Sequence, residues 1–167
     1  MSTHKDSSSR ASLPGYSGGA NEFSRVILKL GGEKKLGLAS ADAAGMLARI
    51  RHGFPATVVD TLSTSTGLSL RETPELLGLS PSTLTRKKAT KALLDPAHSD
   101  RAFRVANAFA YAETVFGEAD KALRWMHKPN RAMGGAVPVE LLDTQLGETA
   151  LPQILTPIEW GPSSHAA

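Results

Sequence analysis

The sequence contains no cysteine, and this absence removes several classes of protein at once. Without thiols there is no disulfide framework, no thiolate metal site and no cysteine nucleophile. The chain also lacks any run of about 18 apolar residues that could span a bilayer, and its Ser-rich start lacks the apolar core of a signal peptide. We therefore expect a soluble, cytoplasmic protein with no membrane partner.

Aromatic residues are scarce, at 5% of the chain. The 41% of hydrophobic residues are mostly Leu, Ala and Val, which suit closely packed helices better than a sandwich of aromatic and β-branched strands. At 167 residues the chain can form one or two small domains. These features predict an all-α fold.

Candidate catalytic and metal-binding groups are also lacking. The histidines lie far apart in the sequence, and no two have the spacing of metal ligands on a helix. No Gly-rich phosphate-binding motif is present. We therefore expect no enzyme, no catalytic residues, no metal and no cofactor. The histidines are His4, His52, His98, His127 and His165.

The net charge of +3 is unevenly distributed. Residues 80–91 carry several cations and no acid, whereas residues 131–167 carry one arginine among several acids. This asymmetry indicates that the two regions meet different partners. The acids of the second region are Glu140, Asp143, Glu148 and Glu159.

Hydrophobic periodicity and turn residues divide the rest of the chain into helices. Residues 1–22 are expected to form a disordered tail, residues 23–32 a strand or a short helix, and the final residues a helix broken by Pro152 and Pro157. The helix beginning at Ser99 and closed by Gly117 has the clearest apolar pattern. The other predicted helices are a capped helix that starts around Ser40 and Asp42 and ends at Gly53, residues 56–66, 72–77, 81–94 and 118–128, and a short helix from Pro138.

The segment around residues 69–91 has the layout of a helix-turn-helix. Gly78 supplies the turn, Ser80 the N-cap and Pro81 the first helical position, while Leu84 faces the core. The opposite face carries short hydroxyls and cations that suit base edges and phosphates in a major groove. The alternative is a capped surface helix whose cations are merely solvated. The predicted DNA-binding residues are Ser82, Thr83, Thr85, Arg86, Lys87, Lys88 and Lys91.

The run GEADKALRWMHKPNRAMGGAVPVELLDTQLGE contains Trp125, two prolines, Gly134-Gly135 and a Leu-Leu pair. This composition predicts a rigid corner whose backbone lies close to another surface. Trp125 could pack in the core or anchor an interface, since tryptophan is common in both settings.

The chain resembles the Xre/MbcA/ParS-like antitoxins, the partners of RES-domain toxins in bacterial type II toxin-antitoxin systems. The resemblance runs from about residue 23 to residue 161. It is carried by GFP at 53–55, LGLSPSTLTRKK at 77–88, SDR at 99–101 and AETVFGEADKALRWMHKPNRAMGGAVPVELLDT at 112–144.

This resemblance implies an N-terminal helix-turn-helix that represses its own operon and a C-terminal domain that covers the active-site cleft of an NAD-depleting toxin. It divides the chain into a tail at 1–22, a DNA-binding domain at 23–98, a toxin-binding domain at 99–161 and a second tail at 162–167. Some residues of the C-terminal signature are expected to hold the fold. The implied toxin-binding residues are Trp125, Pro129, Asn130, Arg131, Gly134, Gly135, Pro138, Leu141, Leu142, Asp143, Thr144, Ile158, Glu159, Trp160 and Gly161.

The implied partners are therefore a RES-domain toxin, operator DNA and a second copy of the chain, because one helix-turn-helix reads DNA weakly and a homodimer engages two half-sites. The end of the chain departs from the family, which usually has an uninterrupted helix there. We hypothesise that Glu159, Trp160 and the residues after Gly161 plug the toxin's cleft. The alternative is a stand-alone regulator whose C-terminal region dimerises or binds a small ligand.

Overall fold

The computed structural model describes the backbone of residues 20–159 and the side chains of residues 22–156. Within this range the chain forms helices joined by turns, with an isolated antiparallel bridge between Pro55 and Leu93. The all-α fold is therefore confirmed. No helix in the described range is long and apolar enough to cross a membrane.

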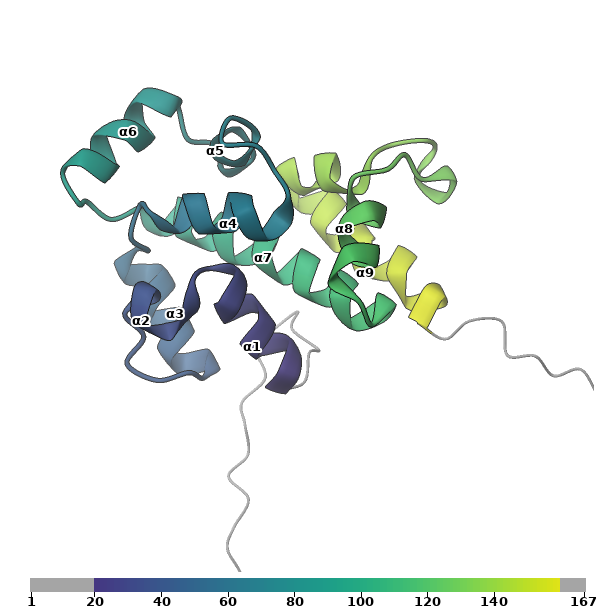
Figure 1. Cartoon of the computed structure of the whole chain (residues 1–167), viewed down its shortest axis with the longest axis horizontal. Coiled ribbons are helices and arrows are strands. Elements are labelled where there is room, and N and C mark those ends of the chain that lie inside the picture. Colours follow the sequence, from purple (N-terminus) through teal and green to yellow (C-terminus); the bar gives the residue numbers. More distant parts are fainter. Residues whose placement is uncertain (1–19, 160–167) are drawn as a thin grey trace, which may run out of the picture.

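The N-terminal half is made of short helices, and the two longest helices, α7 and α9, lie in the C-terminal half (Figure 1). The first group is α1 (Ala20–Lys29), α2 (Gly32–Leu36), α3 (Ala43–His52), α4 (Val58–Thr66), α5 (Glu72–Leu77) and α6 (Pro81–Ala89). The second group is α7 (Pro96–Phe116), α8 (Ala119–Met126), the 3-10 helices η1 (Arg131–Met133) and η2 (Pro138–Asp143), and α9 (Gln145–Glu159).

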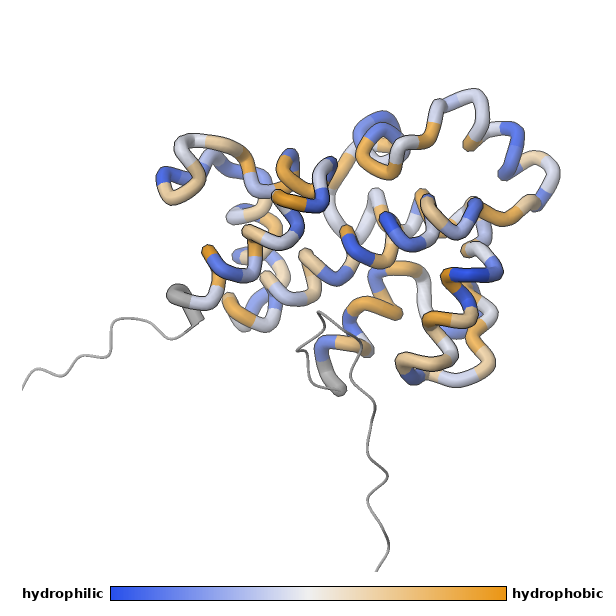
Figure 2. The backbone as a smooth tube through the Cα atoms, turned by 180° about the vertical axis from the view of Figure 1, so that it is seen from behind, coloured by the Kyte–Doolittle hydropathy of each residue, from blue (hydrophilic) through white to orange (hydrophobic). Residues whose placement is uncertain are grey.

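Helix α7 is the centre of the fold. It crosses the middle of the molecule in Figure 1 and packs against α1, α3, α4, α5, α8 and α9. The apolar residues predicted on its inner face are buried except Phe116, which is half-buried, and the alanines among them let neighbouring helices approach closely. Figure 2 shows hydrophobic and hydrophilic stretches alternating along the helices, as expected for amphipathic packing. The buried set on α7 includes Ala102, Val105, Ala106, Phe109 and Ala112.

Helix α1 covers most of the segment 23–32, which the sequence left open as a strand or a short helix. Val26, Ile27 and Leu30 are buried, whereas Leu28 between them is 69% exposed, which is a helical pattern. The helix begins at Ala20, inside the segment assigned to the N-terminal tail, and residues 1–19 lie outside the described residues.

Helix α3 is capped by Asp42. The Asp42 carboxylate accepts a 2.7 Å hydrogen bond from the Gly45 amide and a 2.9 Å bond from the Ser40 hydroxyl. These bonds lower the pKa of Asp42, with the Gly45 amide contributing most. A Cβ at Gly45 would lie 2.2 Å from the Ser40 carbonyl oxygen, so this glycine lets the capping turn fold against the helix.

Helix α6 ends at Ala89, so the predicted extension to residue 94 is wrong. Residues 92–94 instead run beside residues 54–56, and the Leu94 amide donates to the Phe54 carbonyl at 2.7 Å. This long-range pairing takes the segment out of the helix, and Lys91 adopts a left-handed φ of 54°. A Cβ at Gly53 would lie 2.1 Å from the Leu94 carbonyl oxygen, which explains the glycine of the GFP motif.

Two further boundaries differ from the sequence prediction. Helix α7 begins at Pro96 and not at Ser99, because Asp95 in an extended conformation occupies the N-cap position and proline suits the first helical position. Helix α9 is continuous from Gln145 to Glu159, so the prediction of a broken helix is wrong. Pro152 is exposed and removes one backbone donor, while burial of Leu151 and Leu155 in the core holds the helix in place.

Candidate functional site

The helix-turn-helix forms as the sequence predicted. Gly78 ends α5 with φ 75°, and the Leu79 amide donates to the Pro74 carbonyl at 2.8 Å. The Ser80 hydroxyl accepts a 3.2 Å bond from the Thr83 amide and so caps α6. Leu79 and Leu84 are buried and fix the angle at which α6 leaves the turn. They are therefore core residues of this motif.

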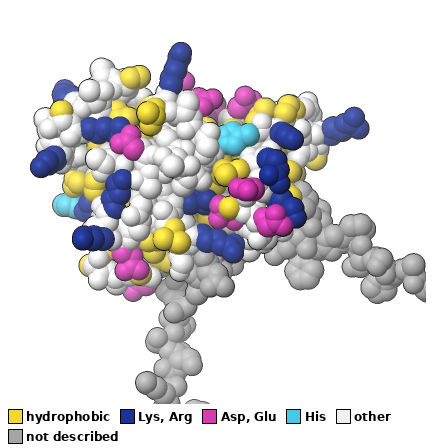
Figure 3. All heavy atoms as spheres, viewed as in Figure 1, with side chains coloured by type: hydrophobic (Ala, Val, Ile, Leu, Met, Phe, Trp, Pro, Cys, Tyr) yellow, Lys and Arg dark blue, Asp and Glu magenta, His cyan; other side chains and the backbone are white. Residues whose placement is uncertain are grey.

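The outward face of α6 carries exposed side chains of Ser82, Thr85 and Arg86. Thr83 is half-buried, and its hydroxyl accepts a 2.8 Å bond from Ser80. Lys91 is exposed but lies beyond the end of the helix. Figure 3 shows basic side chains spread over the end of the molecule that carries α2, α3 and α6. This end of the molecule offers the hydroxyls and cations expected of a DNA-binding surface.

Lys87 and Lys88 do not lie on this outward face as unpaired cations. Lys87 donates to the Leu93 carbonyl at 2.9 Å and lies 3.3 Å from an Asp95 carboxylate oxygen. Lys88 forms an ion pair with Asp60 of α4. Both side chains hold α6 against the rest of the domain, so a phosphate contact would have to compete with these bonds. The structure thus gives them a positioning role that the sequence did not reveal.

The short motifs at residues 53–55 and 99–101 meet beside the helix-turn-helix. The buried Ser99 hydroxyl accepts a 2.8 Å bond from the Phe54 amide and donates to the Asp95 carbonyl at 3.0 Å. Arg101 lies over the turn, since a Cβ at Gly78 would be 2.9 Å from its guanidinium. The motifs therefore fix the start of α7 relative to the DNA-binding helix.

The C-terminal module contains residues that serve the fold. Trp125 is half-buried and stacks at a tilt on Phe116, with ring centroids 5.7 Å apart. Pro138 and Leu142 are buried, and Leu142 is only 2% exposed. In the free chain Pro138 and Leu142 pack inside the module, and their assignment to toxin contact stays a prediction. They belong to the core of the module.

The loop from Pro129 to Ala136 is organised by Asn130. Its side chain accepts a 2.9 Å bond from the Ala132 amide, and its carbonyl accepts from the Gly135 amide at 2.9 Å. Gly134 and Gly135 have φ values of 65° and 90°, and a Cβ on either would meet open space. These glycines are therefore needed for the backbone conformation of the loop. The sequence predicted that their backbone lies close to another surface, and no other described part of the chain lies against it.

The remaining signature residues lie around the start of α9. The Thr144 hydroxyl caps the helix by accepting a 3.1 Å bond from the Gly147 amide. Arg131 and Asp143 are exposed, and Leu141 is half-buried. The backbone of α9 extends through Ile158 and Glu159. The side chains of Ile158 and Glu159, as well as Trp160 and Gly161, lie outside the described residues.

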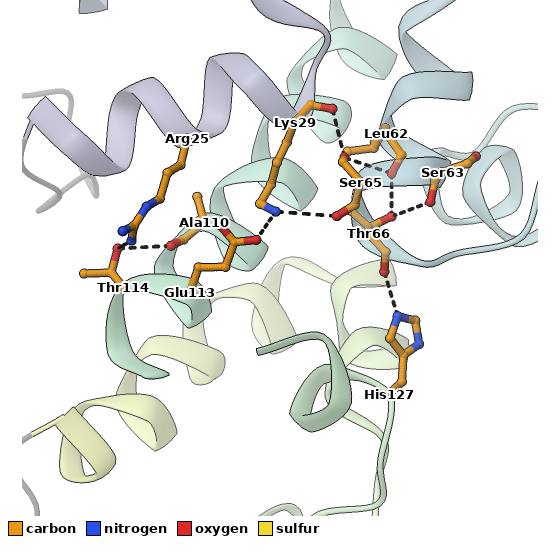
Figure 4. A network of polar contacts seen from close by, with 10 residues as sticks. All are labelled: Arg25, Lys29, Leu62, Ser63, Ser65, Thr66, Ala110, Glu113, Thr114 and His127. Carbon is orange, nitrogen blue, oxygen red and sulfur yellow. Dashed lines mark hydrogen bonds and ion pairs between the residues drawn. The ribbon is translucent and has the colours of Figure 1, made fainter. Parts of the chain in front are cut away.

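A polar network that sequence reasoning missed joins the N-terminal helices to the C-terminal module (Figure 4). The ammonium group of Lys29, whose side chain is 7% exposed, pairs with Glu113 of α7 and donates to the Ser65 carbonyl of α4 at 3.5 Å. Arg25 donates to the Thr114 hydroxyl at 2.8 Å. No local sequence signal predicts such pairs, because their partners lie far apart in the chain.

Another missed feature was visible in the sequence. Ser69 and Glu72 form a reciprocal capping box at the start of α5, with bonds of 2.8 and 3.0 Å. The hydrogen bonds from Ser69 lower the pKa of Glu72. The S-x-x-E spacing is the signal that would have found it.

Among the described residues, no group of three or more histidines and carboxylates is placed to hold a metal ion. The candidate functional residues lie on two parts of the molecule: the exposed side of α6, and the module formed by α8, η1, η2 and α9.

Both parts of the molecule match known protein families. Residues 45–107 match the family described as the antitoxin Xre-like helix-turn-helix domain. Residues 112–161 match the antitoxin Xre/MbcA/ParS C-terminal toxin-binding domain. The helix-turn-helix implies DNA as a partner, and the C-terminal domain implies a toxin.

Curated relatives agree with both matches. Antitoxin Xre of Pseudomonas putida is 38% identical over 113 residues, which cover 68% of this chain and 70% of that protein. Antitoxin Xre of Photorhabdus laumondii is 26% identical over 129 residues, covering 77% of this chain and 87% of that protein. The relative from Yersinia enterocolitica is 25% identical over the same shares. The chain belongs to the Xre/MbcA/ParS family of antitoxins.

Proposed function

We propose that this antitoxin neutralises a RES-domain toxin that depletes NAD, by covering the toxin's active-site cleft. The observation that carries the proposal is the match of residues 112–161 to a toxin-binding domain. The surface chemistry of that domain agrees with it. Glu140 and Asp143 are exposed, and a site that binds the anionic pyrophosphate of NAD is expected to be cationic.

The blocking contact is assigned to the end of the chain. Helix α9 directs the backbone through Ile158 and Glu159 towards residues 160–167. We assign Ile158, Glu159, Trp160 and Gly161 to the toxin contact, with the carboxylate of Glu159 occupying the cationic pocket. A chain truncated after Ile158 should then bind DNA normally and fail to neutralise the toxin.

The DNA-binding domain is proposed to repress the antitoxin's own operon as a homodimer. The exposed hydroxyls and guanidinium of Ser82, Thr85 and Arg86 provide the base and phosphate contacts of one half-site. Two copies are required because a single motif of this size binds operator DNA weakly.

Co-expression with the toxin encoded next to the antitoxin gene tests the proposal. The full chain should protect cells from growth arrest and keep cellular NAD at its normal concentration. The truncated chain should protect neither growth nor NAD, while an Arg86→Ala chain should protect both and lose repression. Growth arrest and NAD loss in the presence of the full chain contradict the proposal. A chain that represses its operon but forms no complex with the toxin is a stand-alone regulator.

A further inference from the structure

Leu146 is the most exposed of the large hydrophobic residues that lie on the surface of the described part of the chain. Its exposed fraction is 81%, against 69% for Leu28 and Leu70 and 36% for Leu47. A single exposed leucine is normal on a protein surface and needs no explanation by itself. Leu146 differs from an ordinary exposed leucine in how its backbone is held and in what surrounds it.

The backbone that carries Leu146 is held rigidly on both sides. Thr144 caps the helix in front of it, and Gly147 behind it packs so closely on η2 that a Cβ would lie 2.0 Å from the Leu141 carbonyl oxygen. One residue further, Glu148 pairs with Arg104 of α7. A side chain on such a fixed corner loses little backbone freedom on binding, which is the property of a preorganised anchor.

Apolar surface continues from Leu146 along α9. Ala150 and Ile154 follow at four-residue intervals, so they lie on the same side of the helix, and both are half-buried. This stripe leads from the η2 corner towards the end of α9. It therefore connects the corner to the segment assigned above to the toxin's cleft.

Acidic groups flank the corner. Residues 143–146 are all exposed, and the carboxylates of Asp143 and Glu140 form no ion pair with any other side chain in the range 22–156. The complementary surface is an apolar pocket with a basic rim. A second copy of this chain meeting the corner about a two-fold axis would bring acids against acids.

We propose that Leu146 is an anchor for the toxin, inserted into an apolar pocket whose rim is basic and lies beside the blocked cleft. This inference rests on the proposed pairing with a toxin and adds a second contact to it, apart from the end of the chain. The match to a toxin-binding domain spans the corner, the stripe and the end of α9.

Leu146→Ala and Leu146→Arg test the anchor, with Leu28→Ala and Leu28→Arg as matched controls. Leu28 is also a highly exposed leucine on a helix, but it lies on α1, outside the toxin-binding domain. The purified full-length variants are titrated with the purified toxin from the neighbouring gene. Both Leu146 variants should weaken toxin binding by about tenfold or more, while both Leu28 variants should stay within about twofold of wild type.

Asp143→Lys tests, in the same titration, whether the toxin's pocket has a basic rim. It should slow association most at low salt and little at high salt, because the rim acts through long-range charge. Operator binding and the thermal midpoint should be unchanged in every variant, which shows that the fold is intact.

Three results would overturn the inference. If Leu146→Ala and Leu146→Arg bind the toxin as tightly as the wild type does, Leu146 is not an anchor, and the proposed function is unaffected. If the free antitoxin is a dimer and these variants are monomers, the corner is a contact between two copies of the chain. Absence of toxin binding by the wild-type chain removes the proposed function together with the anchor.

Discussion

The Nε2 atom of His127 lies 2.7 Å from the carbonyl oxygen of Thr66, so a side chain that follows α8 closes the last turn of α4. The imidazole also packs near Phe109 of α7, with ring centroids 6.0 Å apart. Thr66 belongs to the helix-turn-helix match and His127 to the toxin-binding match. The two matched regions are therefore joined through side chains as well as through α7.

Replacing His127 should weaken this joint in two steps. His127→Phe keeps a ring near Phe109 but loses the bond to Thr66, and should lower the free energy of unfolding by about 1 kcal/mol. His127→Ala removes the ring as well and should lower it by roughly 1 kcal/mol more. Urea denaturation measures both values, and Lys128→Ala is the control because the side chain of Lys128, exposed like that of His127, forms no hydrogen bond or ion pair with another described residue. Equal stability of wild type and His127→Phe would show that the bond contributes nothing.

Lys88 should affect operator binding through the position of α6. Lys88→Ala removes the ion pair with Asp60, which is partly exposed, and should cost about 0.2–1 kcal/mol of stability. Its operator affinity should fall without a change in salt dependence, and Asp60→Ala should behave in the same way.

Arg86→Ala supplies the contrast, because Arg86 is exposed and is expected to reach a phosphate or a base. It should reduce the slope of log affinity against log salt by about 1. If Lys88→Ala reduces this salt-dependence slope as much as Arg86→Ala does, Lys88 contacts a phosphate directly.

Lys91 holds a left-handed backbone conformation, with φ 54°, directly after the cap of α6. Lys91→Gly should raise the free energy of unfolding by roughly 0.5–1 kcal/mol, because glycine adopts this conformation without steric strain. Lys91→Ala removes the same charge and keeps the strain, so its thermal midpoint should not rise. A rise in both variants would point to charge and not to backbone conformation.

Gly147→Ala should destabilise the C-terminal module, although alanine normally favours helices over glycine. The added Cβ would overlap the Leu141 carbonyl, and relief of that overlap should cost about 2–3 kcal/mol. Gly134→Ala is a useful comparison, since its Cβ would enter open space and only its φ of 65° is strained. Thermal unfolding should rank Gly147→Ala well below Gly134→Ala, and the reverse order would rule out the tight corner.

The cap of α3 should make part of the stability depend on pH. The pKa of Asp42 is lowered in the folded chain from its ordinary value of 3.8, so the ionised cap stabilises the fold above that pH. The contribution is lost as the pH falls below 3.8 through the folded-state pKa. Asp42→Asn should therefore lower the thermal midpoint at pH 7, and the difference should shrink in acid. A difference that persists unchanged in acid would contradict the role of the charge.

Residues that act within a few positions of one another were predictable from the sequence. Gly78, Ser80 and Pro81 form their turn and cap by local bonds, and the helix-turn-helix followed from them. The apolar spacing of α7 likewise predicted the buried positions Ala102, Val105, Ala106, Phe109 and Ala112. Local bonding and periodicity are properties of the chain itself, so these features needed no tertiary information.

The sequence by itself thus determined an all-helical antitoxin with a helix-turn-helix and a C-terminal signature. The tertiary structure decided which signature residues lie on the surface. It buried Leu142, turned Lys88 towards Asp60 and ended α6 before Lys91. Each outcome depends on a partner distant in sequence, because burial and ion pairing arise only when helices from different parts of the chain pack together.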